Sequence, residues 1–284
     1  MNVEEVLGAS FAPVEQAYGA RDSILYALGV GFGSQPRDPA HLSFLYEEGL
    51  KAAPTMAVVL GYPGLWMADE RFGLGWQQIL QAEHRLELYE PLPASAAVFG
   101  QNAVIGIEDH GDRGAMLHQQ NILSEAGTGR RLASSTMSIL FREDGGCGNW
   151  GEPPARLDPL PDRAPDRSIE VATWEAQPLL YRLSGDLHPL HVSPAVAQAM
   201  GFDRPILHGL ATMGMAGYAL LRDYADMTPE RLRSIAVRFS APVVPGDGLR
   251  FDVWDEGGGL LRFRGVVPGR DDLKVIDRGT AQLA

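Results

Sequence analysis

A proline-rich stretch, residues 151–167, divides the chain into two parts of similar size. The stretch contains five prolines and alternating charges, without apolar periodicity. This composition is typical of an extended connection and not of a helix or a strand. The chain has 284 residues, so it is long enough for one large core or for two modest ones. The division therefore predicts two domains, residues 1–150 and residues 168–284.

The two parts have the pattern of diverged copies of one unit. Each contains an apolar, helix-like run, at residues 23–31 in the first part and at residues 210–221 in the second. Each run is followed by alternating, strand-like segments, two of which end in proline-containing turns. These segments are 84–93, 96–105, 114–123 and 131–141 in the first part, and 235–246, 249–254, 260–267 and 273–283 in the second. The pattern predicts an internally duplicated α+β fold with antiparallel strands.

Chemically useful side chains are concentrated in the second part. The run Tyr181-Arg-Leu-Ser-Gly-Asp-Leu-His-Pro-Leu-His191 is followed by Pro205-Ile-Leu-His-Gly209. Asp186 and His191 are separated by a proline, which favours a bent loop in which both side chains point at one place. A carboxylate and an imidazole can together activate a water molecule near neutral pH. Gly209 begins the apolar run, and a helix N-terminus offers free N–H groups to a developing oxyanion.

These two strings resemble the signature of the MaoC-like, or type 2, enoyl-CoA hydratases, whose usual form is Tyr-Arg-Leu-Ser-Gly-Asp-x-Asn-Pro-Leu-His and then Pro-Ile-Leu-His-Gly. The resemblance implies a double hot-dog fold, with two tandem hot-dog repeats in which an antiparallel sheet wraps around a central helix. It further implies that residues 1–150 form a non-catalytic, acyl-chain-binding repeat. Residues 168–284 would form the catalytic repeat. The first part has Asp22 without a nearby histidine, so we expect one active site per chain.

The resemblance also assigns roles to single residues. Asp186 and His191 would share the water and its protons, and the N–H of Gly209 would bind the thioester oxygen. Phe239 matches a ligand-contacting aromatic residue, although a role in the core is equally open. Taken without the signature, Asp186 reads as a turn residue and His191 as a core histidine.

Four positions depart from the family's pattern. His188 stands where the family usually has Asn, which leaves three interpretations: a tolerated replacement, an altered substrate preference or a weakened enzyme. Gln81 and Ala82 stand where the family has a His-Gly pair that lines the path of the CoA ligand. His110 replaces a common lysine in the following turn.

The resulting hypothesis is an (R)-specific 2-enoyl-CoA hydratase that converts trans-2-enoyl-CoA to (3R)-3-hydroxyacyl-CoA, for long-chain, branched or sterol side-chain acyl groups. One alternative is a dehydratase of short branched or dicarboxylic acyl-CoA, of the mesaconyl type. A thioesterase is a further enzymatic alternative. An alternative from another class is a non-catalytic acyl-CoA-binding subunit. We expect no cofactor and no metal, although Asp186, His188 and His191 could in principle hold an ion.

Composition limits the partners. The net charge of −12 argues against nucleic acid, which needs a basic protein face. The single cysteine, Cys147, is compatible with a reducing cytoplasm. The N-terminus does not have the pattern of a signal peptide, and no apolar run approaches the ~20 residues of a membrane span. We therefore expect a cytoplasmic homodimer that binds an acyl-CoA thioester.

Overall fold

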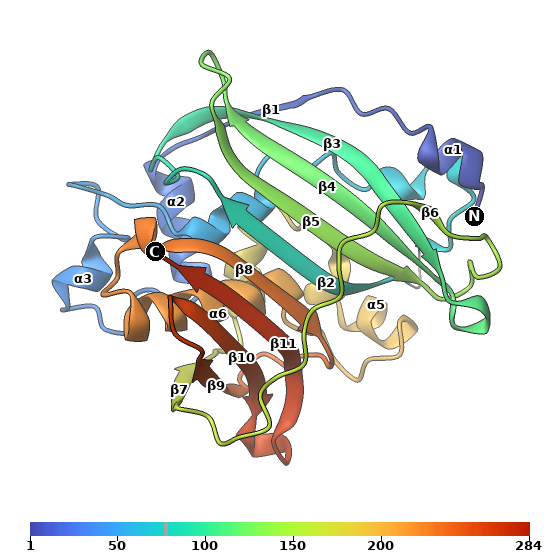
Figure 1. The fold of residues 1–284 in the computed structure, drawn as a ribbon. Coiled ribbons are helices and arrows are strands. Elements are labelled where there is room, and N and C mark those ends of the chain that lie inside the picture. The colour runs from blue at the N-terminus through green and yellow to red at the C-terminus, as the bar shows by residue number, and fades with distance from the viewer. Residues whose placement is uncertain (77–78) are drawn as a thin grey trace.

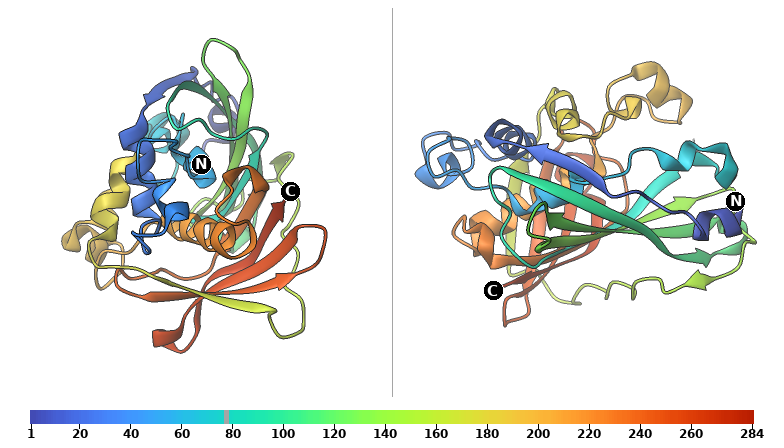
Figure 2. Two further views of the ribbon diagram at one scale, coloured as in Figure 1. Left: turned by 90° about the vertical axis from the view of Figure 1, so that its left-hand side faces the viewer. Right: turned by 90° about the horizontal axis from the view of Figure 1, so that it is seen from above.

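The computed structural model describes residues 1–76 and 79–284. Its strands form one continuous antiparallel sheet, and the longer helices lie on one side of that sheet (Figures 1 and 2). The strands of the first part are β1 (Val14–Tyr18), β2 (Ile79–Leu88), β3 (Ala96–Asp109), β4 (Ala115–Glu125), β5 (Arg131–Phe141) and the short β6 (Trp150–Gly151). Those of the second part are β7 (Arg167–Ala172), β8 (Leu232–Phe239), β9 (Gly248–Asp255), β10 (Leu260–Val267) and β11 (Leu273–Leu283).

The helices connect and cover these strands. The α-helices are α1 (Val3–Leu7), α2 (Ala20–Gly29), α3 (Pro39–Leu42), α4 (Gln177–Tyr181), α5 (Pro194–Ala199) and α6 (Gly209–Tyr224). The 3-10 turns are η1 (Pro54–Val59), η2 (Trp66–Ala68), η3 (Glu70–Phe72), η5 (Gly111–Arg113), η6 (Arg182–Ser184), η7 (Pro189–His191), η8 (Pro229–Arg231) and η9 (Pro268–Arg270).

The order of the strands shows the duplication directly. Across the sheet the order is β1-β3-β4-β5-β2, followed by β8-β11-β10-β9-β7. The short β6 pairs with β3 outside this order. When the five remaining strands of each part are numbered from one to five, both parts have the order 1-3-4-5-2, and they meet at their second strands. The antiparallel pair β2–β8 joins them, with Glu83 opposite Arg238 and Glu87 opposite Ser234. The expected α+β double hot-dog fold is therefore confirmed.

Helix α6 is the centre of the second repeat. Its residues from Ala211 to Leu221 are all buried, as expected of a helix that is apolar on every side. The strands β7 to β11 curve around it (Figure 2), and it contacts η1 of the first repeat as well. The predicted buried helix at residues 210–221 is confirmed, with one turn added at its C-terminal end.

The first repeat is covered differently. Its sheet faces α2, which has ten residues, and η1, which has six, in place of one long helix. Helix α2 begins three residues before the predicted run and packs against α4 of the second repeat. The edge strand β1, which pairs with β3, was not predicted, because its five residues carry only a short alternating pattern.

Five predicted strands have different bounds: β3, β4 and β9 differ by one to four residues at an end, and β2 and β8 end well before the predicted residue. The segment predicted at 84–93 forms β2, which starts five residues earlier and ends at Leu88, before the prolines at 91 and 93. The segment predicted at 235–246 ends as β8 at Phe239. Proline has no N–H to donate to a neighbouring strand, so the prolines that follow both strands exclude their continuation.

The connecting segment crosses the side of the sheet opposite to the helices (Figure 1). Residues 152–166 contain no helix or strand, and side chains of the sheet hold them in place. Arg85 donates to the carbonyl of Ala155, and Arg278 donates to that of Leu157 at 3.1 Å. The ends of the predicted connection, Gly151 and Arg167, belong to β6 and β7.

Within the two described ranges, no helix combines the length and the apolar character that a membrane crossing requires.

Candidate active site

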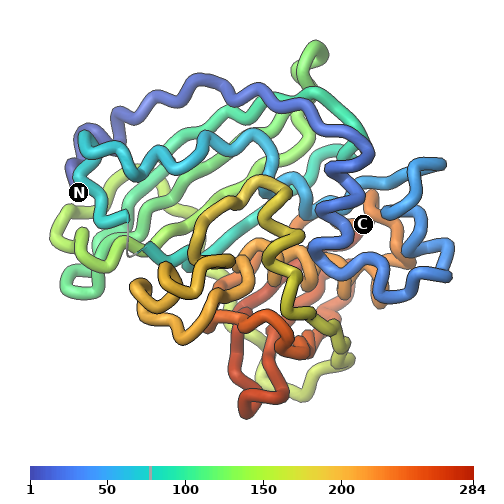
Figure 3. The backbone as a smooth tube through the Cα atoms, turned by 180° about the vertical axis from the view of Figure 1, so that it is seen from behind, coloured from blue at the N-terminus to red at the C-terminus, as the bar shows by residue number. Residues whose placement is uncertain are grey.

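The signature segment folds as a chain of short turns. It leaves α4, passes through η6 and reaches η7, so that Asp186 lies between two 3-10 turns. Gly185 has a φ of +125°, a conformation that a side chain disfavours, and Pro189 begins η7 as the first residue of its turn. Viewed from behind, the segment lies next to α2, in agreement with the contacts of α2 with α4 and η6 (Figure 3).

This path brings Asp186 and His191 together. The Oδ2 atom of Asp186 is 4.0 Å from Nε2 of His191. The His191 Nδ1–H donates to the carbonyl of Ile206 at 2.8 Å, and because a carbonyl can only accept, Nε2 of the neutral ring carries a lone pair. A water molecule that donates a bond of ~2.8 Å to each of two acceptors holds them roughly 4.4 Å apart. The observed separation therefore suits one water between the two side chains.

Burial keeps His191 in the form that this arrangement needs. Burial is the main cause that lowers the pKa of His191 below its ordinary value, and the opposing effect of the Asp186 charge is smaller. The imidazole is thus neutral at pH 7 and can accept a proton from water. The Asp186 carboxylate is 37% exposed and is oriented by the His188 N–H, which donates to Oδ1 at 3.2 Å. Its other oxygen, Oδ2, faces His191.

The ring of His208 stacks on that of His191, with centroids 3.7 Å apart and planes 24° apart. Its Nε2–H donates to the main-chain carbonyl of Asp186 at 3.2 Å, and its Nδ1 is buried without a partner. Burial, assisted by the proximity of His191, lowers the pKa of His208 to about 3. A permanently neutral His208 thus supports both reacting side chains.

His188 caps the turn that carries His191. Its Nδ1 accepts the Leu190 N–H at 3.2 Å, so in the neutral ring the proton is on Nε2. An asparagine side chain would offer its amide oxygen for the same bond. The geometry favours a tolerated replacement over the two other interpretations of this position.

Gly209 begins α6 beside these residues. The first intrahelical bond of α6 runs from the Thr212 N–H to the His208 carbonyl, and the Gly209 N–H makes no hydrogen bond among the described residues. A Cβ on Gly209 would lie 3.4 Å from the ring of Phe239, which places this predicted ligand-contacting ring against the helix N-terminus. The free N–H is available to an oxyanion.

The first repeat approaches this site along β2. Glu83 is opposite Arg238, so Ala82 and Phe239 are the next residues on the two paired strands. The strand has a bulge between Gln81 and Glu83, and the Gln81 Nε2 atom lies 2.9 Å from Nδ1 of His84. An imidazole is therefore present three residues after the position at which the family has one.

His84 itself was not predicted, because only the bulge and the pairing with β8 bring it to this place. Its Nε2 is buried without a partner, and burial lowers its pKa to about 3. His110 lies in the turn before η5, where among the described residues no hydrogen bond or ring contact joins it to Asp186, His191 or Gly209. Its assignment to the CoA path stays a prediction.

Asp186, His191 and His208 also offer three ligand atoms within 4.8 Å of one another. The expected alternative ligand set contained His188 in place of His208. The lone pairs of two imidazoles stacked at 3.7 Å lie in two nearly parallel planes, whereas metal ligands must converge on one ion at ~2.1 Å. His191 Nδ1 and His208 Nε2 are moreover occupied by carbonyl oxygens. The arrangement fits a proton-transfer site better than a metal site.

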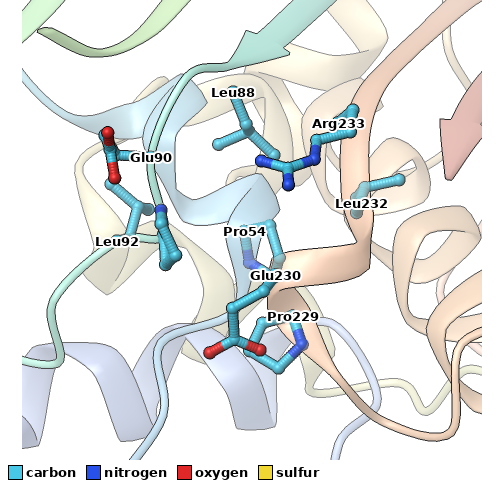
Figure 4. Close-up of a pocket in the computed structure, with 9 residues that line it drawn as sticks. Pro54, Leu88, Glu90, Leu92, Pro229, Glu230, Leu232 and Arg233 are labelled. Carbon is cyan, nitrogen blue, oxygen red and sulfur yellow. The ribbon is translucent and has the colours of Figure 1, made fainter. Parts of the chain in front are cut away.

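A small pocket between the repeats lies at the other end of the β2–β8 pair (Figure 4). It is lined by residues that include Pro54, Leu88, Pro229 and Leu232, and its volume is about 10 Å³. This volume accommodates about one water molecule, so the pocket cannot hold an acyl group.

Comparison with known proteins agrees with the fold. Residues 156–275 match the family model described as MaoC like domain, and residues 16–143 match that of the MFE-2 hydratase 2 N-terminal domain. The chain is 32% identical over 291 residues to a probable enoyl-CoA hydratase 2 of Dictyostelium discoideum, covering 99% of this chain and 96% of that protein. It is 34% identical over 262 residues to the peroxisomal multifunctional enzyme type 2 of Drosophila melanogaster, covering 88% of this chain and 43% of that protein.

A solved structure agrees as well. The MaoC-like dehydratase of Phytophthora capsici superimposes with a TM-score of 0.88 at 32% identity, covering 100% of this chain and 99% of that one. The matches extend over both repeats and include the segment with Asp186, His191 and Gly209. The chain therefore belongs to the MaoC-like family of hydratases and dehydratases, as a double hot-dog member with one repeat of the hydratase 2 N-terminal type.

Proposed function

We propose that the protein is an (R)-specific 2-enoyl-CoA hydratase, which adds water to trans-2-enoyl-CoA to give (3R)-3-hydroxyacyl-CoA. The observation that carries this proposal is the Asp186–His191 pair, which is spaced for one water and has a fixed tautomer, beside the free N–H of Gly209. Relatives named enoyl-CoA hydratase 2 and multifunctional enzyme type 2 support the same reaction.

In the proposed reaction the water donates one hydrogen bond to Asp186 Oδ2 and one to His191 Nε2. As the water oxygen bonds to C3, one of these groups accepts its proton, and the electrons of the C2–C3 double bond move toward the thioester oxygen. The Gly209 N–H stabilises the resulting negative charge. The proton returns to C2, which completes the addition, and the reverse sequence eliminates water.

We further propose that the acyl group is long, branched or of the sterol side-chain type. The face of the first sheet is covered by α2, η1 and irregular chain in place of one long helix. Short turns and loops can be displaced by a bulky acyl chain at a smaller cost than a continuous buried helix can.

The test is the loss of the ultraviolet absorbance of the enoyl thioester in the presence of the purified protein. We would compare crotonyl-CoA, a long-chain enoyl-CoA, a sterol-type enoyl-CoA and mesaconyl-CoA, and determine the chirality of the product at C3. We expect Asp186→Asn to lower kcat by roughly 10²- to 10⁴-fold, the usual contribution of a general base. Asp226→Asn is the matched control, since that carboxylate is 95% exposed at the far end of α6.

Several results would contradict the proposal. Turnover of mesaconyl-CoA alone would favour the dicarboxylic alternative, and release of free CoA would favour a thioesterase. Binding of acyl-CoA without any turnover would favour a non-catalytic binding subunit.

A further inference from the structure

We propose that Tyr62, which belongs to the repeat without the catalytic pair, donates a hydrogen bond to the oxygen on C3 of the acyl group. This inference rests on the proposed function and adds a substrate contact to it. Under this proposal the active site is composite, because each repeat supplies a contact to the same oxygen.

The backbone of the first repeat passes beside the catalytic turn. A Cβ placed on Gly185, the residue before Asp186, would lie 3.7 Å from the carbonyl oxygen of Val59. Tyr62 is three residues further along the same segment. Helix α6 also contacts η1, which ends at Val59, so the segment that leads to Tyr62 is held against the second repeat.

Buried amides fix the two residues before Tyr62. Asn121 Nδ2 donates to the carbonyl of Leu60, and Asn102 Nδ2 donates to that of Gly61, both at 2.9 Å. Gln16 Oε1 accepts the Gly61 N–H at 2.8 Å. Burying polar side chains is costly unless they are hydrogen-bonded, and here these side chains immobilise two consecutive peptide groups. The position of Tyr62 is thereby set by the sheet.

A close approach of two glycines makes this position possible. Gly61 has a φ of +65°, and a Cβ on it would lie 2.7 Å from the Cα of Gly100 in β3. A Cβ on Gly100 would lie 2.1 Å from the carbonyl oxygen of Gly61. Neither residue can carry a side chain without moving the segment, so the approach is specific to these two positions.

The hydroxyl of Tyr62 is a free donor. Among the described residues it makes no hydrogen bond, and Tyr62 as a residue is 38% exposed, which leaves it accessible to a ligand. Desolvation of the phenol by the surrounding protein, with a smaller contribution from the negative charge of Asp186, raises the pKa of Tyr62. The phenol is therefore protonated at neutral pH and lies within the field of the carboxylate that holds the water.

The three groups complement one another chemically. Asp186 Oδ2 and His191 Nε2 both accept hydrogen from the reacting oxygen, which leaves the lone pairs of that oxygen without a donor. The Tyr62 hydroxyl provides this donor. In the dehydration direction the oxygen leaves C3 with the bonding electron pair, and the donor contacts this oxygen in the bound 3-hydroxyacyl-CoA as strongly as in the transition state, so that its loss weakens binding of this substrate and leaves kcat nearly unchanged.

The test uses the fact that only one of the two substrates carries an oxygen on C3. Tyr62→Phe removes the hydroxyl and keeps the ring. For hydration of crotonyl-CoA we expect an unchanged KM and a kcat lowered about tenfold, the effect of losing one hydrogen bond. For dehydration of (R)-3-hydroxybutyryl-CoA we expect a KM raised about tenfold and a nearly unchanged kcat. The two values of kcat/KM then fall by the same factor, as the fixed equilibrium constant requires.

Tyr89→Phe is the matched control, because the Tyr89 hydroxyl is bound to Glu87 at 3.0 Å, just beyond the other end of β2. A Tyr62→Phe variant with unchanged kinetics would overturn the proposal. An equal rise of KM for both substrates would also overturn it, because Tyr62 would then contact the acyl chain and not the oxygen on C3.

Failure of the proposed function is distinguishable from failure of this inference. If the wild-type protein turned over neither substrate, the proposed function would fail, and the contact would be read from the binding of (R)-3-hydroxybutyryl-CoA and butyryl-CoA. If Tyr62 contacts the C3 oxygen, Tyr62→Phe raises the dissociation constant of (R)-3-hydroxybutyryl-CoA about tenfold and leaves that of butyryl-CoA unchanged. Equal dissociation constants of (R)-3-hydroxybutyryl-CoA for the variant and the wild-type protein would overturn the inference.

Discussion

The imidazole of His188 occupies a position that needs a hydrogen-bond acceptor in the turn before His191. Its Nδ1 accepts the Leu190 N–H, while its own main-chain N–H orients Asp186. We predict that His188→Asn retains kcat/KM for enoyl-CoA within about threefold, because the amide oxygen can replace Nδ1 in the cap. His188→Ala removes the acceptor, and losing such a cap costs roughly 1 kcal/mol.

Steady-state kinetics of the two variants at pH 7.5 would check this prediction. We expect His188→Ala to lower kcat/KM by about fivefold to tenfold, since a loosened turn displaces His191. Equal and large losses in both variants would show that the imidazole has a chemical role which an amide cannot supply.

Apart from Phe239, which the family resemblance supplied, the predicted residues around the candidate water lie close together along the chain. Asp186, His188 and His191 belong to one turn-rich segment, and Gly209 starts the next long helix, so their proximity follows from local geometry. Tyr62 and His84 could not be predicted. They reach the second repeat only through the β2–β8 pairing and the amide contacts of the irregular segment after η1, which depend on contacts distant in sequence.

Among the elements, α6 packs against the first repeat through two glycines. A Cβ on Gly214 would lie 2.5 Å from Cγ1 of Val30, and one on Gly217 would lie 2.7 Å from Cγ2 of Thr55. Both neighbours are β-branched and buried, so they cannot rotate away easily. We predict that Gly214→Ala lowers the free energy of unfolding by about 1–2 kcal/mol: overpacking costs about 1–3 kcal/mol, and the higher helix propensity of alanine offsets up to ~1 kcal/mol.

Urea denaturation followed by circular dichroism would measure this change. Gly248→Ala in β9 is the control, because no atom lies within 4 Å of the added Cβ, and we expect a change within about 0.5 kcal/mol. A stabilised Gly214→Ala protein would mean that Val30, which follows α2, and α6 are less closely packed than their contacts indicate.

The strength of the local pattern decided which elements could be predicted. Strands β5, β10 and β11 have the predicted bounds, since each is a long alternating segment between turn residues. The segment from η1 to η3 carries little periodicity, and its backbone bonds go partly to side chains of the sheet. Such a segment has no pattern of its own to detect.

For the molecule as a whole, the paired second strands make the two repeats one structural unit. The connecting residues 152–166 contribute by binding arginines on the face opposite to the helices. The expected homodimer stays a prediction. Sedimentation equilibrium would test it, and a dimer would give twice the molecular mass of one chain. A soluble cytoplasmic location likewise stays a prediction.

The distribution of histidines gives the whole molecule a dependence on pH. Burial is the largest cause that lowers the pKa of five of its seven histidines. These are His41, His84, His118, His191 and His208. The unfolded chain binds protons at these sites near pH ~6.5, whereas the folded protein binds them only at lower pH. Stability is therefore full above pH ~6.5 and decreases as the pH falls, by about 1.4 kcal/mol per pH unit for each proton that only the unfolded chain binds.

His84 allows this prediction to be tested at a single site. Its pKa is lowered to about 3 and its Nε2 has no partner, so between pH 6 and pH 4 it should contribute nearly one full proton to the difference. We predict that His84→Leu reduces the slope of unfolding free energy against pH by about 1.4 kcal/mol per unit in that range, as measured by urea denaturation at several pH values. A buried nitrogen without a hydrogen-bond partner destabilises the folded protein by about 1–3 kcal/mol. The leucine removes this nitrogen together with its cost. An unchanged slope would mean that His84 is protonated in the folded protein. It would contradict the conclusion that the imidazole beside Gln81 is buried and neutral.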